Sequence, residues 1–154
     1  MSEPTISERI QAEMVRAMKE KDAATLSTVR MLKAALMEAK TAKPKDATLS
    51  RDEEIEILQR YVKKRRETIE VNAKVGHPEL NAAEEHEIAV TQRFLPAMLS
   101  EEKLLEIVKA AVAKTGAAGP RDMGKVIGAV MAKVKGKAEG SVVSRLVKEG
   151  LGAA

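Results

Sequence analysis

The sequence predicts an all-α protein in two parts, with an N-terminal domain of about four helices over residues 1–97 and a small three-helix module over residues 98–154. Apolar residues recur at helical spacing along nearly the whole chain. No stretch shows the sustained alternation and the β-branched or aromatic enrichment of a strand. Aromatic residues make up 1% of the chain and hydrophobic residues 44%. The core is therefore expected to be aliphatic.

Two helices and a loop are expected first. Apolar side chains form one stripe over residues 5–21, which predicts the first helix. Asp22 is a suitable N-cap for a second helix over residues 23–40. The periodicity then stops, and Pro44 indicates a loop.

The third helix is the longest that the sequence predicts. Ser50 and Glu53 form a capping-box pattern, which places its start at Arg51, and its apolar row continues to about residue 74. Gly76 is expected to end it, and a fourth helix should run from Pro78 to Pro96.

The second part is predicted to hold three short helices, over residues 101–114, 121–135 and 141–149. Ser100 and the two acidic residues after it suit the start of the first of these helices. Glycines occupy both junctions, where they supply the turns that short connections need. These junction glycines are Gly116, Gly119, Gly136 and Gly140.

The net positive charge belongs to the second part. Residues 1–99 hold 17 basic and 17 acidic side chains, whereas residues 100–154 hold 10 and 6. The excess is concentrated in residues 114–148, with eight basic side chains against two acidic ones. Such an excess attracts polyanions such as nucleic acid, although lysines that only solvate helix surfaces give the same count. The basic run at residues 63–66 has acids at helical spacing, which favours a salt-bridged surface.

The sequence offers no catalytic constellation and no cofactor site. His77 and His86 have no third ligand at metal-binding spacing, so no metal is expected. The segment GAAGPRDMGK lacks the Gly-Lys-Ser/Thr ending of a phosphate-binding loop. Three serines, Ser50, Ser100 and Ser141, are interpreted as helix caps rather than nucleophiles.

A cytoplasmic location without a membrane partner is expected. The chain has no cysteine, which removes disulfides and thiolate chemistry, and nothing in the composition indicates an oxidising compartment. The first residues carry acids and no apolar run, unlike a signal or transit peptide. No window approaches the roughly 18 apolar residues of a membrane span.

Several motifs closely resemble the GatB/YqeY family. The most specific is RDMGKVIGAVMAKVKGKAEG over residues 121–140, which resembles the tail of that family. VRMLKAALMEAK, QRYVKKRRETIE and FLPAMLSEEKLLEIV resemble stand-alone YqeY proteins. The resemblance therefore covers nearly the whole chain.

This resemblance implies a surface that faces tRNA. In the family, the module is shared with the GatB subunit of the glutamine-dependent tRNA amidotransferase, where the tail contacts tRNA and other parts perform the chemistry, and with some glutaminyl-tRNA synthetases. Gly124 and Gly128 are expected to permit close helix packing or close approach of RNA, and Gly136 and Gly140 to form turns. The expected RNA-binding residues are Arg121, Lys125, Lys133, Lys135, Lys137 and Arg145.

Three functions follow as hypotheses. The first is a tRNA-binding accessory protein that is not itself catalytic and acts alone or beside an aminoacyl-tRNA synthetase or amidotransferase. The second is a component of glutamine-dependent carbon–nitrogen ligase activity, as the family kinship suggests. The third is a protein-interaction adaptor that presents its long third helix.

Overall fold

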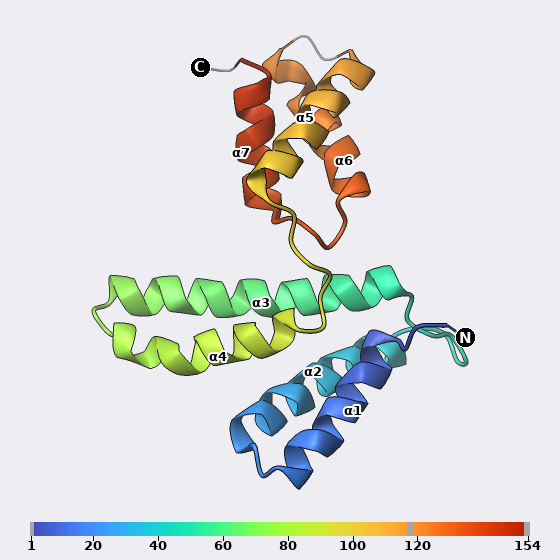
Figure 1. Ribbon diagram of the computed structural model, residues 1–154, viewed down its shortest axis with the longest axis vertical. Helices are drawn as coiled ribbons and strands as arrows, with labels where there is room; N and C mark the ends of the chain where they lie inside the picture. The colour runs from blue at the N-terminus through green and yellow to red at the C-terminus, as the bar shows by residue number, and fades with distance from the viewer. Residues whose placement is uncertain (1, 117–118, 153–154) are drawn as a thin grey trace. The chain divides into compact units, whose positions relative to one another are not determined.

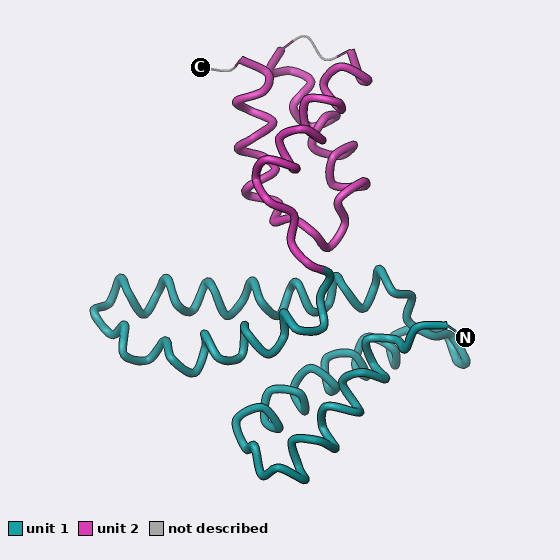
Figure 2. Tube along the Cα trace, viewed as in Figure 1, with its two compact units in different colours: residues 1–96 teal, residues 97–154 magenta. Residues whose placement is uncertain are grey.

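The computed structural model describes residues 2–116 and 119–152, and within these ranges it contains seven α-helices, two short 3-10 helices and no strand (Figure 1). The prediction of an all-α fold is confirmed. The chain forms two compact units, residues 1–96 and residues 97–154 (Figure 2). Among the described helices, none combines the length and apolar character that a bilayer span requires.

The first two helices form a hairpin. Helix α1 is Ile6–Lys19 and helix α2 is Ala23–Thr41. Thr5 and Glu8 form a capping box at the start of α1, and the Asp22 side chain accepts a hydrogen bond from the Thr25 N–H at the start of α2. The connection is short because Lys21 adopts a positive φ of 56°.

Helix α3, Arg51–Lys74, begins at the capping box that the sequence predicts. The Ser50 side chain accepts from the Glu53 N–H, and Glu53 accepts in return from the Ser50 N–H at 3.2 Å. The next residue, Glu54, is buried and accepts from the Ser7 N–H at 2.9 Å. A carboxylate on α3 therefore stabilises the positive N-terminal end of α1.

Helix α4, Asn81–Gln92, is preceded by the 3-10 helix η1, Pro78–Leu80, and ends before the predicted limit at Pro96. Its last carbonyls accept from backbone groups of the next residues, with the Phe94 N–H 3.1 Å from the Thr91 carbonyl and the Leu95 N–H 3.2 Å from the Gln92 carbonyl. The Arg9 guanidinium of α1 donates to the Arg93 carbonyl at 2.7 Å and to the Phe94 carbonyl at 3.4 Å. It also lies 5.5 Å from the Phe94 ring centroid.

The core of the first unit draws on all four helices and on Phe94, which lies two residues after α4. It is almost entirely aliphatic, as expected, and its two aromatic residues are the only two in the chain. The buried residues are Ile6, Ile10, Val29, Leu32, Leu36, Ile55, Leu58, Tyr61, Val90 and Phe94.

The second unit packs three helices around a separate core. Helix α5 is Glu101–Thr115, helix α6 is Met123–Lys133, which follows the 3-10 helix η2, Pro120–Asp122, and helix α7 is Gly140–Gly150. Its buried residues are mainly valines and leucines: Leu104, Val108, Val126, Val130, Val134, Ala138, Val143, Leu146 and Val147.

Two predictions for the start of α7 are wrong. Gly140 was expected in the turn, but it is the first residue of the helix, and the N-cap position is Glu139 rather than Ser141. The turn instead lies at Gly136, which has a φ of +80°. This conformation favours glycine and lets the chain reverse early, so that α7 begins before Ser141.

Candidate nucleic-acid interface

The connection between α6 and α7 presents lysines at every second position. We call residues 133–137 the lysine turn. Lys133, Lys135 and Lys137 are exposed, whereas Val134 and Gly136 between them are buried. Alternation of this kind anchors the backbone through the small and apolar residues and places the lysine side chains on the surface. The sequence KVKGK thus becomes an ordered basic surface.

Backbone hydrogen bonds fix the shape of the lysine turn. The Lys137 N–H donates to the Val134 carbonyl at 2.7 Å, which closes the turn around Gly136. The Lys137 carbonyl accepts from the Leu99 N–H at 2.7 Å, so the turn is tied to the residues before α5. The three lysines therefore project from a backbone whose position does not depend on a ligand.

One side of α6 continues this surface with very small side chains. Val126 and Val130 face the core, whereas four exposed residues, Gly124, Gly128, Ala129 and Ala132, form what we call the small-residue face. A Cβ atom added at Gly124 or Gly128 would meet nothing within 4 Å in the described part of the chain. The helix packing expected of these two glycines is therefore not found there, and both face solvent.

Exposed cations border the small-residue face. Lys125 lies near its start and Lys133 near its end, which at 1.5 Å per residue places their Cα atoms about 12 Å apart along the helix axis. Within residues 2–116 and 119–152, no ion pair engages Arg121, Lys125, Lys133 or Lys137. Their charges are available to a ligand.

Arg145 differs from the other predicted RNA-binding residues. Its guanidinium pairs with Glu101 at the start of α5 and, at 3.4 Å, with Glu149 one turn further along α7. It thereby joins two helices of the unit. Arg145 is better explained by this structural role than by the RNA contact that the sequence suggested.

The start of α7 adds hydrogen-bond donors beside the lysine turn. Side chains cap the N-termini of α1, α2, α3 and α5, whereas within the described residues no side chain caps α4, α6 or α7. The first N–H groups of a helix have no partner inside it and carry partial positive charge. Together with three lysines, they suit phosphate oxygens.

Titratable groups with shifted pKa values lie in the first unit, and their causes are structural. The Lys43 ammonium, 2.7 Å away, holds the pKa of Glu53 below its usual value. A hydrogen bond from Arg16 does the same to the pKa of Glu13. Burial raises the pKa of Tyr61, and the nearby Glu87 carboxylate adds to the effect. None of these groups forms a nucleophile–base pair.

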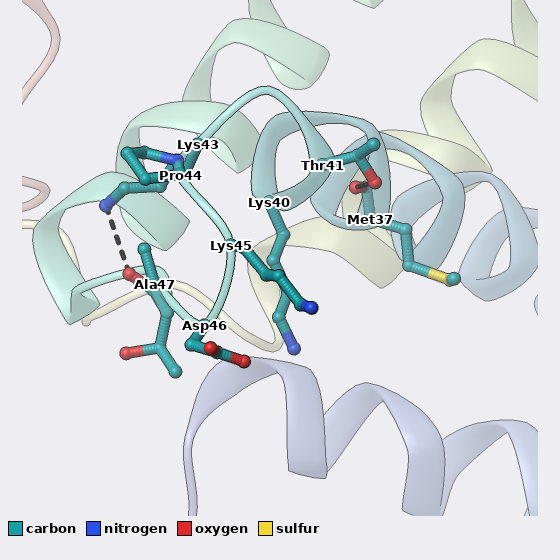
Figure 3. Close-up of a pocket in the computed structure, with 9 residues that line it drawn as sticks. Met37, Lys40, Thr41, Lys43, Pro44, Lys45, Asp46 and Ala47 are labelled. Atoms are coloured by element: carbon teal, nitrogen blue, oxygen red, sulfur yellow. Dashed lines mark hydrogen bonds between the residues drawn. The ribbon is translucent and has the colours of Figure 1, made fainter.

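A hollow of about 630 Å³ lies at the loop between α2 and α3 (Figure 3). Lys40, Lys43 and Lys45 contribute to its lining, but the Lys43 ammonium is bound by Glu53 and by the Thr48 carbonyl at 3.0 Å. Figure 3 shows Lys40, Lys45 and Asp46 among the side chains that line the hollow. In the described ranges no three His, Cys, Asp or Glu residues are grouped to hold a metal ion. The lining of the hollow contains one carboxylate, Asp46, and no histidine, cysteine or serine.

Comparison with known proteins decides the family. A family model described as Yqey-like protein matches residues 7–151. This chain belongs to the YqeY-like family. The resemblance that the sequence motifs indicated is thus confirmed, and the matched region includes both compact units of this YqeY-like chain.

A similar protein is known from a fungus. Altered inheritance of mitochondria protein 41, mitochondrial, from Pyrenophora tritici-repentis (strain Pt-1C-BFP), is 30% identical over 157 residues. The alignment covers 98% of this YqeY-like chain and 83% of the relative. The likeness therefore extends over nearly the full sequence rather than over the tail alone.

Sequence reasoning identified the lysines of this YqeY-like protein but not their setting. It treated Lys133, Lys135 and Lys137 as part of a helix and its end, whereas the last two lie in an ordered turn. The alternation of lysine with Val134, Gly136 and Ala138 was the signal that could have revealed the turn. The sequence did not predict that α7 begins without a side-chain cap, because Ser141 resembles an N-cap residue.

Proposed function

We propose that this YqeY-like protein is a non-catalytic accessory protein that binds tRNA through its C-terminal unit. The observation that carries the proposal is the lysine turn, which holds three cations on an ordered backbone beside the uncapped start of α7. Unpaired Lys125 and the small-residue face extend the surface, and a phosphate backbone can approach α6 closely at this face because its exposed residues are glycine and alanine.

The mode of binding follows from what surrounds these cations. Tyr61 and Phe94, the two aromatic residues of the chain, both lie in the core of the first unit. Bases of a single strand are usually stacked on aromatic side chains, and this surface offers none. Binding should therefore depend on phosphates and on the shape of a folded RNA, with a strong dependence on salt.

The tRNA assignment rests on kinship. The DMGKVIG and KGKAEG motifs lie at the proposed surface, and they resemble the tail that the amidotransferase uses to contact tRNA. A synthetase or amidotransferase is accordingly the proposed associate. Carbon–nitrogen ligase activity is the weaker alternative, because no acid–base or nucleophilic pair accompanies the lysines.

Removal of the turn lysines tests the proposal. The affinity of the full chain for tRNA, measured by fluorescence anisotropy over a range of NaCl concentrations, should decrease in the triple variant K133A/K135A/K137A. The slope of log K against log salt should fall by about 2 to 3, since each lost phosphate contact removes roughly one unit.

A matched variant controls for net charge. K63A/K64A/K74A removes three exposed lysines from α3 in the first unit, and its salt slope should stay within about half a unit of the unsubstituted protein. An unchanged slope in the turn variant contradicts the proposal. Equal losses in the two triple variants would mean that total charge, not the lysine turn, determines binding.

A cytoplasmic site of action is proposed from composition. The fungal relative has the word mitochondrial in its name, which makes an organelle the alternative for this chain. Cell fractionation with detection of the native protein separates the two.

A further inference from the structure

The end of the α3–α4 hairpin at which the chain passes from α3 to α4 exposes large apolar side chains that do not pack in the core. We define the hairpin tip as residues 71–80, which connect α3 to α4 (Figure 1). Val71, Val75 and Leu80 are 56%, 61% and 57% exposed. The other large hydrophobic residues with comparable exposure in the described chain are spread over α1, α2 and the segment between the units.

The tip is ordered by its own hydrogen bonds. The Asn72 side chain donates to the Asn81 side-chain oxygen at 2.9 Å, and Asn81, 8% exposed, donates to the Ile69 carbonyl at 3.4 Å. The His77 N–H donates to the Asn72 carbonyl at 2.8 Å, and Gly76 supplies the positive φ of the turn. The apolar side chains are thus held on a formed surface rather than on a frayed end.

Stability does not explain these residues. Val71 lies in the last turn of α3, and Val75 is the C-cap residue that follows the helix. Valine is a poorer helix former than alanine, lysine or glutamate, because its branched Cβ restricts the side chain. The solvent-facing end of α3 would be more stable with a polar residue in place of Val71, so helix stability does not account for its exposure.

The surrounding charge determines the kind of ligand. Residues 67–87 contain six glutamates and one lysine, Lys74. Glu84 and Glu87 pair with Arg65, at 3.5 and 3.3 Å, and Glu79 lies 2.9 Å from Nδ1 of His77. Glu67, Glu70, Glu79 and Glu85 are exposed. A nucleic acid or an anionic membrane surface would be repelled by these carboxylates.

We propose that the hairpin tip is a docking surface for a basic amphipathic helix of a partner protein. The apolar side of such a helix would cover Val71, Val75 and Leu80, and its lysines or arginines would face the glutamates. This is a common way for a helix to bind a helical surface, and the exposed glutamates near the tip would speed association with a basic helix. The site is separate from the proposed tRNA surface and makes the protein an adaptor.

A synthetic helix of leucine and lysine is the probe, and a peptide with the same leucines but glutamate in place of lysine is its control. The full-length protein should bind the basic peptide and not the acidic one, as measured by isothermal titration calorimetry at low salt. Val75→Glu and Leu80→Glu should each weaken binding by about tenfold or more, since each removes an apolar contact and buries a charge.

Two controls make the result decisive. Met37→Glu changes a residue that is also 57% exposed but lies on α2, and it should leave peptide affinity unchanged. All variants should keep their thermal midpoint and their tRNA affinity, so failure of this proposal and failure of the tRNA proposal are distinguishable. Equal binding of the two peptides, or equal loss with Met37→Glu, overturns the docking surface.

Self-association is the competing outcome. The basic C-terminal unit of a second copy carries the charge that the tip would attract. Sedimentation velocity should show a monomer whose state does not change with Val75→Glu. A dimer that this substitution dissociates would overturn a partner protein as the occupant.

Discussion

The C-terminal unit and the hairpin tip are both surfaces that the fold leaves uncovered, yet they are built in opposite ways. The C-terminal unit sets lysines around glycine and alanine, so that charge is prominent and side-chain bulk is small. The hairpin tip sets glutamates around branched aliphatic residues. The first combination suits a polyanion that approaches the backbone closely, and the second suits a cationic helix with an apolar side. Opposite charge also prevents the two surfaces from competing for one ligand.

The largest expected effect comes from the core beneath one surface. Leu146→Ala removes a side chain that is 4% exposed in the C-terminal core, and it should lower the free energy of unfolding by about 2–5 kcal/mol. The tRNA-binding midpoint in urea should fall with it, whereas the peptide-binding midpoint should not. Leu58→Ala, in the first core, should give the reverse pattern. Equal shifts of both midpoints in either variant would show that the two surfaces do not depend on separate cores.

A smaller effect is expected from the hydrogen bonds that shape the hairpin tip. Asn81→Ala leaves the Asn72 amide and the Ile69 carbonyl without their partner, which should cost about 1–3 kcal/mol in the free energy of unfolding. Hydrogen exchange at residues 72–81 should speed up and affinity for the basic peptide should fall. Affinity for tRNA should be unaffected. A loss of tRNA binding would mean that the surfaces are coupled.

The smallest effect concerns Arg145, which the sequence assigned to RNA. Because its guanidinium is 49% exposed and pairs with Glu101 and Glu149, Arg145→Gln should lower the free energy of unfolding by less than about 1 kcal/mol. The salt slope of tRNA binding should change less than with Lys137→Gln. If Arg145→Gln has the larger effect on the slope, the ion pairs open on binding and Arg145 belongs to the interface.

Much of the fold followed from local signals. Ser50 with Glu53 located the start of α3, Asp22 that of α2 and Ser100 that of α5, because the groups that cap a helix are neighbours in sequence. The end of α4 was predicted too late. The carbonyls of the two residues after it, Arg93 and Phe94, accept from Arg9, which is more than 80 residues away, and no local pattern reveals such a partner.

The candidate surfaces show the same division. Charge counting found the basic C-terminal unit, and the family motif named the lysines within it. Neither could tell that Arg145 was already paired, or that Gly124 and Gly128 face solvent rather than a neighbouring helix. The sequence did not reveal the residues of the hairpin tip, because Val71 and Val75 resemble any buried apolar pair until their exposure is known.

By itself, the sequence of this YqeY-like protein determined that the chain is helical, where most helices begin, and that its net positive charge lies in the last third. These properties depend on periodicity, capping and composition, which act over a few residues. Only the tertiary structure decided which side of each helix is covered and which charges are already paired. Burial and ion pairing join residues distant in the chain, and they determine which lysines and valines remain open to a ligand.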